Sequence, residues 1–352
     1  MITNQRRARI GYISGGRSVP TVRFRLAFVD LLRERGHVVA VFHAIPSRYD
    51  FFKAIGWRLS QKFRMLVRYW HLLQIQLSRY DAVILETGFV HTSDASLELQ
   101  LRAVSTRLVF EIDDAVFLLF PEKLKLIAEL ADHVIAGNRD IAAWAQKYCS
   151  SVSIIPTCVD IRTYQPKDYN RLLDHAKPVV GWIGSHGNLP MLNVCVNALR
   201  RAYETTPFEL HIVTAAKHHN DAVDLAGLDV KWIDIDRCDV VRQLQMFDVG
   251  LMPLPDDDPW MCYKCNAKMI QYMAVAVPAI ASKIGFNLEI VTHGVNSMLA
   301  QTEAEWESAL VHLLSNRELR QQLGLAARDT VLERYTVQSS IEQYERSVLG
   351  TL

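Results

Sequence analysis

The sequence predicts an α/β fold made of two doubly wound, Rossmann-like domains in one chain. Short β-rich apolar runs alternate with helical patterns along nearly all of the 352 residues. This alternation is typical of parallel sheets with helices on both faces. A polar segment carrying Pro166 and Pro178 interrupts the alternation, which then restarts. At roughly 100–200 residues per domain, the length accommodates two such domains.

The first domain is predicted to cover residues 1–160. It opens with a buried strand at 8–14, the turn Gly15-Gly16 and a helix at about 22–35. Gly36 follows that helix at the position of a C-terminal cap. Further strands are expected at 37–43, 80–86, 107–112, 133–137 and 152–156.

The second domain is predicted to cover residues 178–335, after a linker at 161–177. Its strands are expected at 178–184, 208–214, 229–234, 248–254, 278–282 and 297–300. From Glu303 onward the chain is predicted to be helical throughout, with residues 336–352 packing back toward the N-terminal domain. Two such domains are expected to face each other across a cleft at the carboxyl ends of their sheets, where open α/β folds place ligands.

Composition and charge exclude several classes of protein. Half of the residues are hydrophobic and 22% are charged, which excludes a disordered chain. No stretch reaches the ~18 apolar residues of a membrane span, and the first residues lack the features of a signal peptide, so a cytoplasmic location is expected. A net charge of +1 argues against nucleic acid as a partner.

Each domain opens with a glycine-bearing turn after its first strand. The turns are Gly15-Gly16 in the first domain and Gly184-Ser185-His186 in the second. Glycines there let backbone N–H groups approach a phosphate at a helix N-terminus. Neither turn matches G-x-G-x-x-G, which disfavours a nicotinamide dehydrogenase. The alternative is that both are ordinary strand-to-helix turns.

The segment WMCYKCNAKMIQYMAVAVPAIASKIGFNLEIV, residues 260–291, is the most informative. Asn266 is expected to cap a helix that runs to about Val277. If that helix reaches back to Lys264, then Lys264, Lys268 and Gln271 share one face. A lysine in a first turn opposes the helix dipole, and a bound pyrophosphate would remove this conflict. The alternative is two solvated lysines on an exposed helix.

This segment resembles the donor site of the retaining GT-B glycosyltransferases, specifically the bacterial polysaccharide-type members of glycosyltransferase family 4. Those members read K-x-x-x-K-x-x-x-Y-M-A-x-G-x-P-x-x-A-S, and the chain matches from Lys264 to Ser282, with Ala276 in place of the glycine. The resemblance implies a GT-B fold and a hexosyltransferase-like enzyme of polysaccharide biosynthesis. It would transfer a sugar from a nucleoside-diphosphate sugar with retention of configuration. It also implies no metal and no cofactor beyond the nucleotide sugar as co-substrate.

The resemblance also assigns roles to single residues. Lys268 and Lys264 correspond to the cations that stabilise the departing diphosphate, and His186 to a basic residue that serves the phosphate. Tyr263 and Gln271 stand where the family has paired glutamates, and Gln271 is expected to hold the ribose.

On the acceptor side, Asp113 and Asp114 follow a predicted strand at the carboxyl edge of its sheet. They are expected to orient the acceptor hydroxyl or to contact the donor sugar, and the alternative is that one of them caps the next helix. Arg23 and Arg25 resemble the family's acceptor-side arginines, and a solvated helix face explains them nearly as well. The acceptor is expected to be a glycan, a lipid-linked molecule or a small molecule.

Two other functions stay open at this point. One is a nucleotide-sugar-binding or scaffold protein without turnover, and the other is a sugar-nucleotide epimerase of the same fold. The acidic runs 234–236 and 256–258 mimic the D-x-D metal site of the GT-A fold, but the two-domain pattern argues against a metal role.

Residues 48–79 predict a membrane-facing surface. This segment holds seven Lys or Arg and one acidic residue, and it carries an apolar stripe at helical spacing: Phe52, Ile55, Leu59, Phe63, Leu66, Trp70, Leu73 and Leu77. One interpretation is peripheral docking to anionic lipid on the inner face of the membrane. The other is that the stripe packs in the core while the cations face water.

Overall fold

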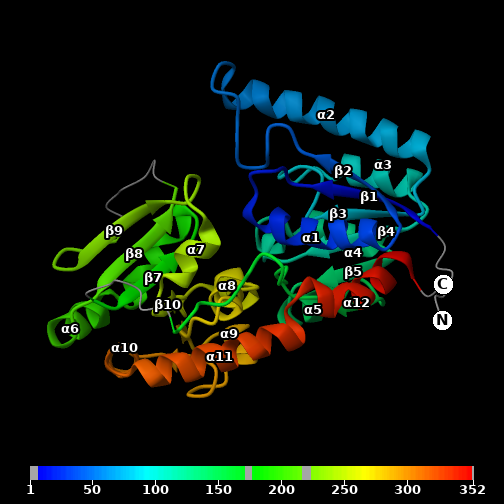
Figure 1. The fold of residues 1–352 in the computed structure, drawn as a ribbon. Coiled ribbons are helices and arrows are strands. Elements are labelled where there is room, and N and C mark those ends of the chain that lie inside the picture. The colour runs from blue at the N-terminus through cyan, green and yellow to red at the C-terminus, as the bar shows by residue number, and fades with distance from the viewer. Residues whose placement is uncertain (1–6, 171–176, 216–222, 351–352) are drawn as a thin grey trace, which may run out of the picture. The chain divides into compact units, whose positions relative to one another are not determined.

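The computed structural model describes residues 7–170, 177–215 and 223–350, and within α1 it leaves out the side chains of residues 20, 21 and 23. The chain forms two compact units. The first comprises residues 1–158, 263–265 and 337–352, and the second comprises 159–262 and 266–336. Each unit is built on a parallel six-stranded sheet (Figure 1). The predicted α/β fold with two Rossmann-like sheets is therefore confirmed.

The first sheet has the strand order β2-β1-β3-β4-β5-β6. Its strands are β1 (Arg9–Ser14), β2 (Val38–His43), β3 (Ala82–Glu86), β4 (Leu108–Ile112), β5 (His133–Ala136) and β6 (Val152–Ile154). Strand β1 pairs on both sides, with Ile10 opposite Val39 of β2 and opposite Ala82 of β3. The inner strands β1, β3, β4 and β5 are almost wholly buried, and their sequences are therefore mostly apolar and do not alternate between apolar and polar residues.

The helices of the first unit follow its strands. They are α1 (Pro20–Glu34), α2 (Gly56–Ser78), α3 (Ser96–Val104), the 3-10 helix η1 (Val116–Leu118), α4 (Pro121–Leu130), α5 (Arg139–Ala145) and α12 (Val337–Leu349). Gly36 has φ +98° directly after α1, as its predicted place in the helix cap requires. Helix α12 packs on α1, where the rings of Phe28 and Tyr344 stack 4.4 Å apart.

The second sheet has the strand order β12-β11-β10-β7-β8-β9. Its strands are β7 (Val179–Ile183), β8 (Glu209–Thr214), β9 (Asp229–Asp234), β10 (Val249–Met252), β11 (Ala279–Ser282) and β12 (Met298–Ala300). Each of these strands was predicted to within three residues at either end. The strand order reverses beside β7, and ligands of doubly wound sheets bind at such switch points.

The remaining helices are η2 (His186–Val194), α6 (Val196–Thr205), α7 (Val240–Gln245), η3 (Pro259–Tyr263), α8 (Ala267–Ala274), α9 (Asn287–Ile290), α10 (Glu303–Ser315) and α11 (Arg317–Arg334). The stretch after Glu303 is thus not one continuous helical segment. It breaks at Asn316, which caps α11 by accepting a hydrogen bond from Leu319 N, and again before α12.

The segment predicted as a linker is described as far as residue 170 and belongs to the second unit. Lys167 N donates to Val275 O at 2.8 Å, and Lys167 Nζ pairs with Asp248 at 2.9 Å. Tyr169 donates its hydroxyl to Ala276 O at 2.7 Å. No helix in the described part of the chain is long and apolar enough to cross a membrane.

Candidate active site

Lys268 lies at the carboxyl edge of the second sheet, where β7 ends. Its Nζ stands 4.6 Å from the ring centroid of Trp182. A Cβ built on Gly184 would lie 2.8 Å from Lys268 Cε and 2.7 Å from the Trp182 indole. Only a residue without a side chain leaves this path open, and the indole face favours a cation above it. The structure thereby brings together Gly184 and Lys268, which lie far apart in the sequence.

Tyr272 fixes α8 against the same edge of the sheet. Its hydroxyl accepts a hydrogen bond from Ile183 N at 3.1 Å and donates one to Leu251 O at 3.2 Å, so it bridges β7 and β10. A Cβ on Gly250 would come within 2.7 Å of the Tyr272 ring, so this glycine makes room for it. Burial raises the pKa of Tyr272, which keeps the hydroxyl protonated and able to donate.

The turn after β7 leads into η2. Gly184 N donates to Val213 O at 3.0 Å, so this amide belongs to the sheet. Ser185 is exposed and precedes η2, and its Oγ accepts from Asn188 Nδ2 at 3.0 Å. His186 is half-buried and is the first residue of η2. Ser185 and His186 therefore stand where a loop meets a helix N-terminus, next to the end of β7.

Helix α8 begins directly after Asn266, as the sequence predicts, and does not extend back to Lys264. The helix begins at Ala267, so Lys264 is not on it and does not stand one turn above Lys268. Asn266 occupies the cap position with φ +44° and makes no capping hydrogen bond with its side chain. Its Nδ2 donates instead to Asn287 Oδ1 at 2.7 Å, because the left-handed backbone turns this amide away from the helix.

Gln271 also has a different environment from the one expected. Its side chain is only 2% exposed, and its Nε2 donates to the hydroxyl of Tyr164 at 2.9 Å. The amide is thus engaged inside the second unit. The sequence reasoning overlooked Tyr164 because it lies in the stretch taken as a linker.

Lys264 and Tyr263 are grouped with the first unit, and both are half-buried. The carbonyl of Tyr263 accepts a hydrogen bond from Asn138 Nδ2 at 2.8 Å. Its ring meets Phe117 edge-on at a centroid distance of 5.0 Å. These contacts hold the backbone and the ring of Tyr263.

The carboxyl edge of the first sheet carries a cluster of buried charges. Glu86 ends β3 and its Oε2 accepts from Gly15 N at 2.9 Å, while Arg48 donates to Glu86 O at 3.2 Å. Burial raises the pKa of Glu86, and Arg48 opposes that rise. Sequence reasoning missed Glu86 and Arg48. A charged residue at the end of an apolar parallel strand is the signal that points to Glu86.

The two glycines of the first turn are held by protein groups. Gly15 N donates to Glu86, and Gly16 N donates to Ser14 Oγ at 3.2 Å. Gly16 has φ +116°, and a Cβ there would overlap Ser47, so this position requires glycine. The expectation that these amides face a phosphate does not match the partners they have in this structure.

Arg25 is buried, with 1% of its surface exposed. Its Nε lies 3.3 Å from Glu111 Oε1, and Glu111 Oε2 accepts from the hydroxyls of Tyr12 at 3.1 Å and Tyr344 at 3.4 Å. Burial raises the pKa of Glu111 to about 7, against the opposing effect of Arg25. Arg25 is therefore neither on a solvated helix face nor exposed to an acceptor. Arg23 lies in α1, and its side chain is outside the described residues.

The two predicted aspartates follow β4. Asp113 is 9% exposed, and the neighbouring Gly137 leaves room for it, since a Cβ on Gly137 would lie 3.0 Å from Asp113 Cα. Asp114 is half-buried and its Oδ1 accepts from Ala115 N at 2.9 Å, in the turn that leads to η1. The structure thus places Asp113 with Glu86 and Glu111 at one edge of the first sheet.

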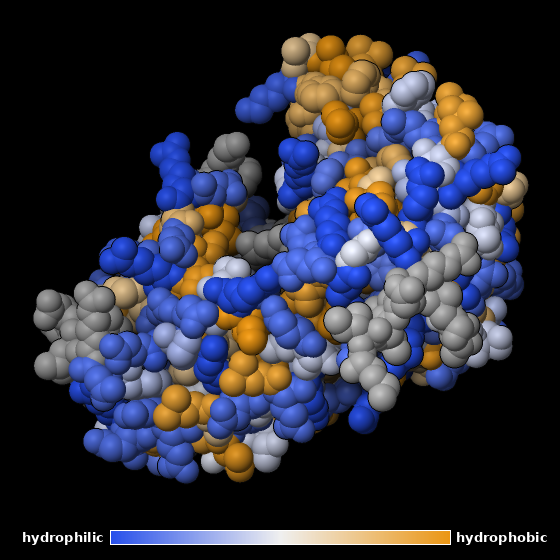
Figure 2. All heavy atoms as spheres, turned by 45° about the vertical axis from the view of Figure 1, so that its right-hand side comes forward, coloured by the Kyte–Doolittle hydropathy of each residue, from blue (hydrophilic) through white to orange (hydrophobic). Residues whose placement is uncertain are grey.

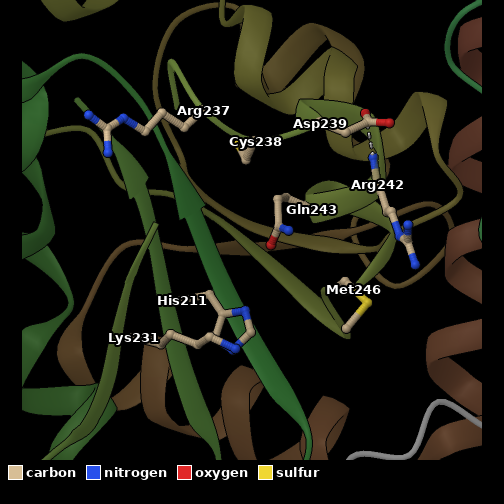
Figure 3. A pocket seen from close by; sticks show the side chains of 8 residues that line it. All are labelled: His211, Lys231, Arg237, Cys238, Asp239, Arg242, Gln243 and Met246. Atoms are coloured by element: carbon tan, nitrogen blue, oxygen red, sulfur yellow. Dashed lines mark hydrogen bonds between the residues drawn. The ribbon is translucent and has the colours of Figure 1, made fainter. Parts of the chain in front are cut away.

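A separate open pocket of about 510 Å³ lies in the second unit, between α7 and the strands β8 and β9 (Figure 3). His211 and Lys231 line it from neighbouring strands, and Arg242 and Gln243 line it from α7. None of the predicted site residues is among its lining residues. In the described part of the chain, no three His, Cys, Asp or Glu side chains group so as to hold a metal ion.

Comparison with known proteins gives a family match within the second half of the chain. Residues 177–316 match the family model of glycosyl transferases group 1. This region contains the end of β7, η2 and α8. No curated protein sequence matches the chain.

Solved structures with low sequence identity share the whole fold. The chain is similar to Alr3699/HepE of Anabaena in complex with UDP and glucose, with 17% identity, a TM-score of 0.69 and coverage of 98% of this chain and 100% of that one. It is similar to a sucrose-phosphate synthase from Thermosynechococcus elongatus, with 14% identity, a TM-score of 0.71 and coverage of 97% and 98%. A lipopolysaccharide outer core galactosyltransferase, WaaB, matches with 15% identity, a TM-score of 0.64 and coverage of 98% and 100%. The chain therefore has the GT-B fold, and residues 177–316 are similar to the glycosyl transferases group 1.

Proposed function

We propose that the protein transfers a sugar from a nucleoside-diphosphate sugar to a hydroxyl acceptor, with retention of the anomeric configuration. The observation that carries the proposal is the place of Lys268, whose ammonium lies over Trp182 beside Gly184 at the end of β7. A fixed cation next to a glycine turn and a helix N-terminus suits a pyrophosphate. HepE, whose fold the chain shares, is described in complex with UDP-glucose, which supports a nucleotide sugar as donor.

In this reaction, negative charge develops on the departing diphosphate. The bond between the anomeric carbon and the diphosphate oxygen breaks, and the acceptor oxygen forms its new bond on the same face. The acceptor proton passes to the departing phosphate, so the donor unit needs no side-chain base and no metal. Lys268 and the first N–H groups of η2 stabilise the charge that grows on the phosphate. We assign assisting roles to Lys264 and His186.

The acceptor is assigned to the first unit. Asp113 stands at the carboxyl edge of β4 among other buried acids, and a carboxylate there accepts a hydrogen bond from a sugar hydroxyl. We assign the same role to Asp114, and we expect a glycan, a lipid-linked molecule or a small molecule as acceptor, in polysaccharide biosynthesis.

The test is a panel of UDP-, GDP-, ADP- and TDP-sugars, each with and without hydroxyl acceptors, in which release of nucleoside diphosphate is measured. We expect acceptor-dependent release with one donor, and NMR of the product should show the donor's anomeric configuration. Inversion would contradict the stereochemical part of the proposal. Binding without release would indicate a scaffold protein, and a changed sugar nucleotide without acceptor would indicate an epimerase.

A further inference from the structure

Helix α2 carries its apolar residues on the outside of the first unit. The residues Phe52, Ile55, Leu59, Phe63, Leu66, Trp70, Leu73 and Leu77, here called the α2 stripe, are all exposed. Leu66 is 67% exposed and Leu77 75%. Figure 2 shows hydrophobic residues gathered at the top of the view, where Figure 1 places α2. The prediction that the stripe packs in the core is therefore wrong.

The buried face of α2 contains Leu72 and Ile75 near its end and is otherwise polar, and two of its arginines fix which way the helix is turned. Arg64 Nε donates to Pro46 O at 2.9 Å, and its Nη2 donates to Ser47 O at 2.7 Å. Arg68 is fully buried, and it donates to Ser14 O at 2.7 Å and to Phe89 O at 2.9 Å. Turning the stripe inward would break these hydrogen bonds, which tie α2 to the loop at residues 46–47 and to the end of β1. The exposure of the stripe is thus built into the fold.

Cations and aromatic residues border the α2 stripe. Arg58 and Lys62 are exposed on α2, and Lys53 is exposed just before it. No acidic residue occurs from residue 51 to residue 79. Trp57 and Tyr69 are also exposed, and such amphipathic rings favour the boundary between water and lipid.

We propose that the α2 stripe docks on the surface of an anionic lipid bilayer, with α2 lying in the plane of the interface. The apolar side chains would enter the acyl boundary, and Lys53, Arg58 and Lys62 would meet lipid phosphates. A second copy of this chain fits less well, because a twofold contact would bring like cations together with no acid on the segment to pair with them. The inference does not depend on the glycosyltransferase activity.

The test is flotation of the full chain with two kinds of vesicle, one of phosphatidylcholine alone and one of equal parts phosphatidylcholine and phosphatidylglycerol. We expect binding to the anionic vesicles that weakens as salt is raised. The triple variant Leu66→Gln, Trp70→Gln, Leu77→Gln should bind at least about tenfold more weakly, because three buried apolar contacts are lost. The matched control changes three exposed leucines elsewhere, Leu99→Gln, Leu325→Gln and Leu332→Gln, and should float like the parent protein.

A second variant separates charge from apolar insertion. Lys53→Glu, Arg58→Glu, Lys62→Glu should lose the preference for anionic vesicles while its melting temperature stays unchanged, since all three residues are exposed. Arg64 and Arg68 are unsuitable for charge reversal because they are buried. The proposal would be overturned if the parent protein does not float with the vesicles. It would also be overturned if the parent protein and both triple variants float equally. A dimer in solution that the stripe variant abolishes, without flotation of the parent protein, would assign the stripe to a second copy instead.

Discussion

Lys268 owes its place to two neighbours that carry no charge. Gly184 leaves room for its aliphatic chain, and the Trp182 ring lies under its ammonium. In the proposed reaction, the contact of Lys268 with the leaving phosphate would strengthen as negative charge builds up, and would thus act on the transition state more than on the bound substrate. We expect Lys268→Ala to lower kcat about 10²–10³-fold, by analogy with the loss of one oxyanion donor. Steady-state kinetics with the true donor and acceptor measures this.

Two variants control this experiment. Lys231→Ala removes an exposed lysine from the same unit and should leave kcat unchanged. Gly184→Ala keeps the charge of Lys268 but displaces its side chain, so this variant should also lower kcat. The melting temperature of the variant shows whether the substitution has also disturbed the packing. A folded Lys268→Ala variant with nearly unchanged kcat would remove Lys268 from the mechanism.

Gln271 is predicted to act through stability more than through the donor. Its side chain is buried and hydrogen-bonded to Tyr164, so Gln271→Ala leaves a buried hydroxyl without this donor. We expect the free energy of unfolding to fall by about 1–3 kcal/mol, as measured by urea denaturation. An unchanged unfolding free energy together with a raised KM for the donor would instead support the ribose contact implied by the family resemblance.

At the level of the elements, α8 is shorter than its sequence pattern suggests. It ends at Ala274, and the chain leaves it through Ala276, which has φ +59°. The glycosyltransferases that this segment resembles have glycine at this position, and a left-handed backbone is one that glycine adopts without strain. The pattern of apolar residues continues past the helix because residues 275–277 are buried in the turn before β11.

His71 on α2 makes the first unit sensitive to acid. Burial, and then the neighbouring Arg68, lower the pKa of His71 to about 4. The unfolded chain, with a histidine pKa near 6.5, binds the proton more readily, so this contribution to stability is complete above about pH 6.5 and is lost as the pH falls toward 4. Allowing for partial solvent screening, we expect a loss on the order of 1–2 kcal/mol between pH 7 and pH 5.

The measurement is urea denaturation of the parent protein and of His71→Gln at these two pH values. Glutamine keeps an acceptor for Arg68 and does not titrate, so the variant should lose less stability in acid than the parent protein. Equal losses in the two proteins would show that His71 does not carry this pH dependence.

At the scale of the whole molecule, each unit has its own core and its own sheet, and the residues assigned to the diphosphate lie mainly in the second. A nucleoside diphosphate that binds only the folded state should raise the melting temperature, because 100-fold excess over Kd adds about 2.7 kcal/mol. In hydrogen exchange, we expect the protected amides to lie around the start of η2 and α8. Protection confined to the pocket between α7 and β8 would place the nucleotide elsewhere.

The sequence by itself determined the sheets, and it pointed to the segment that we propose binds the diphosphate. Strand positions were predictable because parallel strands buried on both faces must be apolar throughout, as in residues 82–85 and 249–252. Lys268 was singled out because a lysine in a first helical turn is unfavourable without an anion, and the structure confirms that it lies in the first turn of α8.

Only the tertiary structure decided the environment of each polar side chain. The TVRFR pattern does not reveal that Arg25 is buried against Glu111, because its partner lies 86 residues away in the chain. The amphipathic pattern likewise shows that α2 has an apolar and a polar face. It does not show which of the two faces turns toward the sheet. The buried guanidinium of Arg68 decides that, because it donates to carbonyls at the ends of β1 and β2. These hydrogen bonds join residues that lie 26 and 54 positions apart, so the local sequence pattern cannot show them.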